Sequence, residues 1–319
     1  MSAEAATALY ERISTDEQFR ARLEAVPPPV VVLAPARSCS SVVVAMLGCH
    51  PDLYAFPELK LFAHDTLADL LDAPPRLSIL QKSGRRWDPA SGLCRAVAEL
   101  VVGGQDPAAL AHARGWLDER RQWPTRDVLA VLLELVAPRA GVEKSPETTF
   151  DDAGPARALS WHPAARFIHL VRHPVAFQSS LQRLLLLYDK PEFCARAWLS
   201  THRRIAAFCA ALPQGQSMLV RAEDMLDPSD SLLAEIARFL EVSDEQAALE
   251  SMRHPERSPY SLGRSMGQEE CAYWDPGFLA NPVLRPPRVP SSLAAPREWR
   301  LPASLNEEIV ELAESLGYA

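Results

Sequence analysis

Three short hydrophobic runs along the chain each end at a polar loop, and each is followed by a segment with helical character. The runs cover residues 30–34, 166–171 and 217–221 and are rich in Val, Ile and Leu. Continuous apolar runs of this length, bounded by turn residues, predict strands that are buried on both faces. Because helical segments separate the runs, we expect neighbouring parallel strands joined by right-handed crossovers. The pattern therefore predicts an α/β fold.

Helical periodicity accounts for most of the remaining chain. The spacing of apolar positions in residues 3–24 predicts one amphipathic helix, which the prolines at 27–29 end. This helix either packs on the core or docks to a partner. Residues 63–140 are helical by pattern, with breaks at Pro or Gly, and predict an insertion that lies over the functional site. Shorter helices are predicted at 41–47, 175–187, 228–241 and 303–316.

Three segments carry weaker patterns. Residues 53–62 predict a short strand or extended piece, in which Glu58 and Lys60 either face water at a strand edge or place a carboxylate beside the functional site. Residues 141–147 predict a short charged turn. Residues 251–300 are rich in Pro, Arg and Ser, and they predict either a flap over a ligand or a surface loop.

Composition narrows the class of protein. The 319 residues are 48% hydrophobic and 23% charged, as in a soluble globular protein, and the net charge of −8 argues against nucleic acid as a partner. No apolar run is long enough to cross a membrane, and residues 1–10 lack the features of a signal peptide, so we expect a cytoplasmic protein. The six cysteines form no C-x-x-C pair, so we expect reduced core or loop residues and no disulfides or metal site. They are Cys39, Cys49, Cys94, Cys194, Cys209 and Cys271.

The loop after the first hydrophobic run has the composition of an anion site. Arg37 would supply a planar fork of donors, and Ser38, Ser40 and Ser41 would supply hydroxyl donors or a helix cap beside Cys39. Backbone N–H groups at the start of the following helix have no intrahelical partner and carry partial positive charge. The alternative is a Ser-rich turn that only caps the helix. The loop lacks the Gly and Lys of a Walker motif.

A second arginine has the same placement. Arg172 ends the second hydrophobic run, and His173-Pro174 then leads into a helix that carries Ser180 eight residues after the arginine. Ligands of open α/β sheets bind at the carboxyl ends of the strands. We therefore expect Arg37, Arg172 and Ser180 to face one pocket.

Taken in order, these segments resemble the sulfotransferases that use 3′-phosphoadenosine 5′-phosphosulfate (PAPS), above all the branch found in bacterial polyketide and other natural-product pathways. In that family the first loop follows P-x-R-S-G-S/T-S/T, and the second motif is V-R-H/D-P followed by a serine eight residues after the arginine. The branch also carries P-P-E-L-H, D/E-K-S-P and R-Y-E-D-L. The matching segments here are 35–41, 171–174 with Ser180, 56–60, 143–146 and 221–225.

The resemblance implies a P-loop-like three-layer fold, a central parallel sheet flanked by helices with a helical insertion over the active site. It implies that residues 37–41 hold the 5′-phosphosulfate of PAPS, and that Arg172 and Ser180 hold the 3′-phosphate. Arg37 and the loop amides would stabilise charge on the departing phosphate oxygen. No metal is required if these donors suffice.

The resemblance also implies a base for the acceptor hydroxyl. Glu58 is the candidate, and His173 and His64 are its rivals. The alternative for His173 is that it only completes the turn before Pro174, and the alternative for His64 is that it lies on a helix surface. Lys144 would help to neutralise the sulfonate, or would form a surface salt bridge with Glu143. Arg183 would face the cofactor or acceptor, or lie on a solvated helix face.

The chain departs from the family pattern at several positions. Cys39 stands where the family has Gly, which predicts a strained loop if the backbone there has a positive φ. Lys60 stands where the branch often has His, and Ala222 where an aromatic residue is usual. The flap has no clear match to the family; its candidate contact residues are Arg253, Arg257, Arg264 and Trp274.

We expect one domain, residues 1–319, that transfers a sulfuryl group from PAPS to a hydroxyl of a small molecule, free or carried on an acyl carrier protein. Two alternatives remain open, an inactive relative that serves as a binding or scaffold subunit and a P-loop kinase or NTPase. The expected parts of the domain are a nucleotide-binding core at 25–62 and 141–245, the substrate-side insertion at 63–140 and the flap at 250–300.

Overall fold

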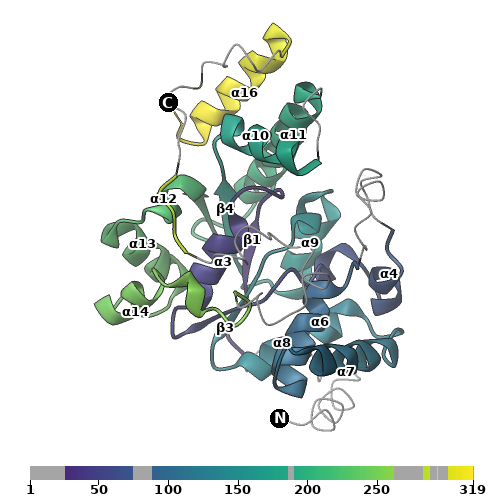
Figure 1. The fold of residues 1–319 in the computed structure, drawn as a ribbon. Helices are drawn as coiled ribbons and strands as arrows, with labels where there is room; N and C mark the ends of the chain where they lie inside the picture. The colour runs from purple at the N-terminus through teal and green to yellow at the C-terminus, as the bar shows by residue number, and fades with distance from the viewer. Residues whose placement is uncertain are drawn as a thin grey trace.

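A parallel sheet lies at the centre of the molecule (Figure 1). The computed structural model describes residues 26–74, 88–185, 190–261, 283–287, 293 and 301–318. Within these residues the sheet has five strands in the order β2-β3-β1-β4-β5, and every neighbouring pair is parallel. The strands are β1 (Val30–Leu33), β2 (Leu53–Ala55), β3 (Ala140–Glu143), β4 (Arg166–Val171) and β5 (Ser217–Arg221).

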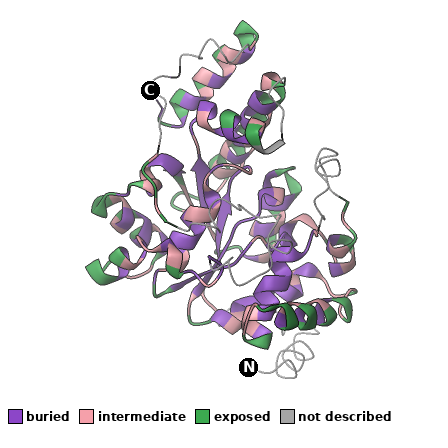
Figure 2. Ribbon diagram, in the orientation of Figure 1, coloured by how far each residue is buried: buried purple, intermediate pink, exposed green. Residues whose placement is uncertain are grey.

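Helices cover both faces of the sheet, which makes the fold three-layered, as predicted. In β1, Val30 and Val32 pack into one hydrophobic cluster, whereas Val31 and Leu33 pack into another on the opposite face. Strands β1 and β3 are buried throughout, and β4 is buried after its first residue, while the outer helix faces are exposed (Figure 2). The first face is covered by α3 (Ser40–Gly48), α12 (Ala222–Leu226), α13 (Asp230–Leu240) and α14 (Gln246–Ser251).

The opposite face is covered mainly by the chain between β2 and β3. Within the described residues this segment is helical up to β3, as its pattern predicts, and its apolar side chains form the largest cluster with α9 (Ala153–Trp161). Its elements are η1 (Leu61–Ala63), α4 (Leu67–Leu71), α6 (Ser91–Val97), η2 (Ala98–Val102), α7 (Pro107–Asp118) and α8 (Thr125–Val136).

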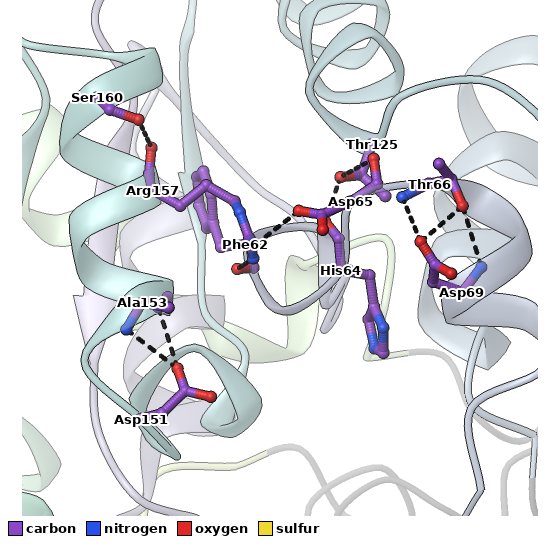
Figure 3. A network of polar contacts seen from close by, with 11 residues as sticks. Phe62, His64, Asp65, Thr66, Asp69, Thr125, Asp151, Ala153, Arg157 and Ser160 are labelled. Atoms are coloured by element: carbon purple, nitrogen blue, oxygen red, sulfur yellow. Dashed lines mark hydrogen bonds and ion pairs between the residues drawn. The ribbon is translucent and has the colours of Figure 1, made fainter.

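Polar contacts from α9 and α8 hold the start of this helical segment (Figure 3). Arg157 of α9 donates to the Phe62 carbonyl (2.5 Å) and to the Asp65 carboxylate (2.6 Å). Thr125, the first residue of α8, donates its hydroxyl to the His64 carbonyl (2.6 Å). The loop that follows Glu58 is therefore held on two sides.

A third cluster lies beyond the end of β4. The helices α10 (Pro174–Leu185), α11 (Pro191–Ala210) and α16 (Ala303–Ser315) pack together there, around Phe177, Trp198 and Ile309 (Figure 1). Among the helices that the structure describes, none is long and apolar enough to cross a membrane. The predicted helix at 3–24, and Arg264 and Trp274 of the predicted flap, lie outside the described residues.

The prediction of a turn at 141–147 was wrong for its first half. Ala140–Glu143 is strand β3, which lies between β2 and β1 and is buried along its whole length. The strand is only four residues long and contains a glycine and a buried carboxyl group, so it lacks the hydrophobic signal of β1. The 3₁₀-helix η3 (Pro146–Thr149) follows it directly.

The close approach of α3 to β2 can be tested at Gly48. A Cβ at this position would lie 2.4 Å from the Ala55 Cβ and 2.8 Å from the Ala55 nitrogen, so we expect Gly48→Ala to lower the free energy of unfolding by about 1–3 kcal/mol. Gly115 lies in α7, where a Cβ would have nothing within 4 Å, and Gly115→Ala should raise the free energy of unfolding by about 0.5–1 kcal/mol. Urea unfolding followed by circular dichroism measures both, and shifts of the same sign would contradict the packing.

Candidate active site

The predicted site residues follow the carboxyl ends of different strands. Glu58 follows β2, Lys144 follows β3, Arg37 follows β1 and Arg172 follows β4. Because all the strands are parallel, these ends meet at one edge of the sheet, and the strand order places the residues in that sequence along it. Neighbouring strands lie about 4.8 Å apart, so the row of strand ends spans roughly 20 Å. Glu223, which follows β5, completes the row.

The loop between β1 and α3 adopts a strained backbone. Arg37 has a φ of 73° and Cys39 a φ of 59°, both in the left-handed region, which costs roughly 1–2 kcal/mol for each residue. The position at which the family has Gly therefore does require a positive φ. Cys39 is also the N-cap of α3 and makes no side-chain cap bond, so the alternative of a serine that merely caps the helix is not supported.

The serines of this loop are partly withdrawn from solvent. Ser38 is fully buried, and its hydroxyl oxygen has no hydrogen-bond partner within the part of the chain that the structure describes. Ser40 is buried in the first turn of α3, and Ser41 is half-buried. Buried hydroxyl groups are normally hydrogen-bonded, so the Ser38 hydroxyl is available to donate to a ligand. Together with the first N–H groups of α3, it suits a bound anion.

Hydrogen bonds join the two predicted halves of the site. Arg37 donates from Nε to the hydroxyl oxygen of Ser180 (3.1 Å), and Arg172 donates from Nη1 to the Arg37 carbonyl (2.7 Å). Ser180 is buried on α10, while both arginines are half-buried. The structure therefore brings together three residues that are far apart in sequence. Two guanidinium groups in one partly buried site favour a ligand with more than one negative group.

Hydrogen bonds to its backbone fix the turn that carries Arg172. The Trp198 indole N–H donates to the Arg172 carbonyl (2.9 Å), and the His173 N–H donates to Glu223 Oε1 (2.9 Å). His173 Nδ1 accepts from the Val175 N–H (3.3 Å). This contact fits the alternative in which His173 completes the turn before the helix. Burial lowers the pKa of the His173 imidazole.

A buried ion pair links the ends of β2 and β3. The Lys144 ammonium donates to Glu58 Oε1, and the side chains are 4% and 17% exposed. Glu58 is therefore the partner that a second molecule can reach, and Lys144 lies beneath it. The alternative of a surface salt bridge between Lys144 and Glu143 was wrong, because both residues are buried and Lys144 pairs with Glu58, while Glu143 accepts from the Ser145 hydroxyl (2.5 Å).

Lys60 is part of the same linkage. Its ammonium pairs with Glu147 Oε1 (3.1 Å), and its backbone N–H donates to the Ser145 hydroxyl (2.8 Å). Lys60 is 6% exposed, so the expectation of a charge facing water at a strand edge was wrong for this residue. Buried charges need partners, because desolvation costs several kcal/mol for each ion. The residue that stands in place of the branch's His is thus engaged by Glu147.

Glu143 is the most strongly perturbed acid of the cluster. Burial raises the pKa of its carboxyl group to about 7, although the Ser145 hydroxyl and the Lys144 ammonium oppose the shift. Glu143 Oε2 has no hydrogen-bond partner among the described residues. A protonated carboxyl group can satisfy this environment better than a carboxylate can.

The remaining candidate residues make no contact with the Arg37, Arg172 or Glu58 groups among the hydrogen bonds and ion pairs described above. Arg183 is exposed on α10, Ala222 is buried under the sheet edge, and the ring of His64 points away from the contacts that hold its loop (Figure 3). Arg253 pairs with Asp230, and Arg257 is exposed. Within the residues that the structure describes, no group of three or more His, Cys, Asp or Glu residues could hold a metal ion.

Several residues that support the site could not be identified from the sequence. Glu223 lies in the R-A-E-D-M segment, which carries a motif signal, but the motif does not reveal the contact with His173. Ser145 and Glu147 follow Lys144 closely, and only their structural contacts show that they organise Lys60. Trp198 lies within a long helix and carries no sequence signal for its bond to Arg172.

Comparison with known proteins places this geometry in a family. The model of the sulfotransferase family matches residues 28–246, and the chain belongs to that family. The chain is similar to the sulfotransferase domain of the Synechococcus PCC 7002 olefin synthase, with 27% identity over 92% of this chain and 96% of that one, at a TM-score of 0.67. The resemblance identified from the sequence motifs is therefore confirmed.

A second solved structure supports the fold. The sulfotransferase domain from the curacin biosynthetic pathway is 20% identical over 92% of this chain and 98% of that one, at a TM-score of 0.68. No curated protein matches the sequence.

The burial of Glu143 predicts a pH dependence of stability. Between its usual pKa and about 7, this carboxyl group is protonated in the folded chain but ionised in the unfolded chain, so stability falls as pH rises and levels off above about 7. Relative to Glu143→Gln, which does not titrate, the wild type should lose about 2–3 kcal/mol between about pH 5 and pH 8. Urea unfolding at the two pH values measures the difference, and a difference independent of pH would contradict the assignment.

Proposed function

We propose that this member of the sulfotransferase family transfers the sulfuryl group of PAPS to a hydroxyl group of an acceptor. The observation that carries the proposal is the set of hydrogen bonds from Arg172 to the Arg37 carbonyl and from Arg37 to Ser180. These bonds join an anion loop at the start of a helix to a second cationic turn at the same sheet edge. A ligand with phosphate groups at two positions matches such an arrangement.

The residues present fit PAPS. Arg37, the buried Ser38 hydroxyl and the backbone amides of residues 39–41, at the N-cap and first turn of α3, would hold the 5′-phosphosulfate. Arg172 and Ser180 would hold the 3′-phosphate, a group that ATP lacks. PAPS would supply an activated sulfuryl group attached to a phosphate leaving group. Guanidinium and amide donors would supply the positive charge, so no metal ion is required.

The anion loop would lower the barrier by fixed electrostatics. Negative charge grows on the departing phosphate oxygen during sulfuryl transfer, and preorganised donors aimed at such an oxygen typically contribute about 3–4 kcal/mol each. Arg37 is held by Ser180 and by its own strained backbone. These donors therefore need little reorganisation when the charge develops.

Glu58 would act as the general base. Its carboxylate is the more exposed partner of the pair with Lys144, so it can accept the proton of an acceptor hydroxyl group. Lys144 would hold the carboxylate in place and carry positive charge close to the sulfonate. The hydrogen bond from the Lys60 N–H to the Ser145 hydroxyl keeps the two loops together.

The structural relatives suggest the kind of acceptor. Their sulfotransferase domains come from an olefin synthase and from the curacin biosynthetic pathway. We propose an acceptor hydroxyl on a natural-product intermediate in a bacterial cytoplasm, either free or carried on an acyl carrier protein.

Ligand binding tests the donor site. PAP, the product of PAPS, should raise the melting temperature of the wild type, and ATP without magnesium should raise it much less. Arg37→Ala and Arg172→Ala each remove a charge-assisted contact worth about 1.5–3 kcal/mol, so PAP affinity should fall roughly 10- to 100-fold. Differential scanning fluorimetry and calorimetric titration measure these effects.

Arg196→Ala provides the matched control. Arg196 is an exposed arginine of α11 whose partner is Glu192, so its removal should leave PAP binding unchanged. An equal response of the wild type to PAP and ATP would contradict the donor assignment and favour a kinase or NTPase.

The role of Glu58 is tested by Glu58→Gln. The substitution keeps the size of the side chain but removes the proton acceptor, so kcat should fall about 10²- to 10⁴-fold. PAP affinity should stay within about twofold, because Glu58 follows β2, which β3 separates from β1 and the Arg37 loop. Transfer of radiolabelled sulfonate to a hydroxyl acceptor measures kcat. Unchanged turnover would show that another group accepts the proton.

A further inference from the structure

One peptide group in the Arg172 turn is hydrogen-bonded from both sides. Its carbonyl, from Arg172, accepts from Trp198, and its N–H, from His173, donates to Glu223, both at 2.9 Å. The two atoms belong to the same rigid plane, so these bonds fix its orientation. The backbone from which the Arg172 side chain starts is therefore set by Trp198 of α11 and Glu223 of α12.

Glu223 in turn depends on a residue far away in sequence. The Tyr318 hydroxyl donates to Glu223 Oε2 (2.8 Å), and the Tyr318 ring packs edge-on against the His173 ring at 5.3 Å between centroids. Tyr318 and Glu223 are 7% and 8% exposed, so water competes little with this bond. Burial raises the pKa of the Tyr318 hydroxyl far above its usual range, so it remains a donor at neutral pH.

A backbone contact brings Tyr318 to this place. Arg221, the last residue of β5, donates from Nη1 to the Gly317 carbonyl (2.6 Å) and also pairs with Asp224. The segment that follows α16 is thereby attached to the end of β5, next to the Arg172 turn. Gly317 has a φ of 85°, in the left-handed region that favours glycine, and this conformation lets the chain leave α16 toward β5.

We propose that Tyr318 is a positioning residue for the site of the 3′-phosphate. Through Glu223 it holds the Arg172–His173 peptide, and so it sets the direction in which the Arg172 guanidinium approaches its ligand. The inference rests on the proposed function, because it assigns Arg172 to the 3′-phosphate of the donor. It adds α16 and the residues after it to the parts of the chain that determine donor affinity.

A purely structural role for Tyr318 makes a different prediction. Tyr318 also belongs to the hydrophobic cluster of α10, α11 and α16, and loss of packing there would lower stability and weaken every nucleotide alike. A positioning role acts on the 3′-phosphate alone. Comparison of PAP with AMP, which lacks only that phosphate, separates the two roles.

The test is Tyr318→Phe in the full chain. The substitution removes the hydroxyl group but keeps the ring, so we expect calorimetric titration to show a dissociation constant for PAP about tenfold higher and a constant for AMP unchanged. In the Arg172→Ala background, Tyr318→Phe should have no further effect on PAP, because the side chain that it positions is gone.

Tyr54→Phe is the matched control. It also removes a buried tyrosine hydroxyl group, whose bond to the Tyr260 hydroxyl (2.8 Å) lies in another cluster, and it should change neither dissociation constant. Equal weakening of PAP and AMP in Tyr318→Phe, or no weakening of either, would overturn the inference while leaving the proposed function intact. A wild type that does not prefer PAP to AMP would overturn both.

Discussion

Parallel strands that are covered on both faces bring their carboxyl ends to one common edge, and the candidate active site depends on this alignment. The strand order β2-β3-β1-β4-β5 converts positions scattered along the chain into a row. Three pairs of neighbours in that row contact one another: Lys144 pairs with Glu58, Arg172 donates to the Arg37 carbonyl, and the His173 N–H donates to Glu223. A shift of β4 along its axis would break the contacts on both of its sides.

The row has two chemically different flanks. On the β2–β3 side, charges are buried in pairs, Lys144 with Glu58 and Lys60 with Glu147, and their desolvation is offset by close partners. On the β4–β5 side, peptide and aromatic groups together with Glu223 fix the backbone that carries Arg172. The loop at Arg37 lies between the two flanks. The free-energy cost of its left-handed backbone falls at a position where a bound ligand can offset it.

The sequence predicted the fold class, the three strands β1, β4 and β5, β2 as one of two alternatives for residues 53–62, and the convergence of Arg37, Arg172 and Ser180 on one site. These features follow from local signals, namely hydrophobic runs, turn residues and motif spacing. The prediction failed at β3, which has only four residues and includes the buried Glu143. This segment is recognisable as a strand only from its pairing with β1 and β2. Partners such as Trp198 and Tyr318 could not be predicted, because only tertiary packing brings them to the Arg172 turn.

The central place of β1 has a consequence for divergence within the family. Loops after β2 and β3 lie on one side of the β1 loop, and those after β4 and β5 on the other, with separate sets of supporting contacts. Substitutions at distant sites without shared partners have additive effects. An exchange such as Lys60 for His on one flank thus leaves the scaffold of the opposite flank in register, so the proposed acceptor side can change without alteration of the proposed donor site.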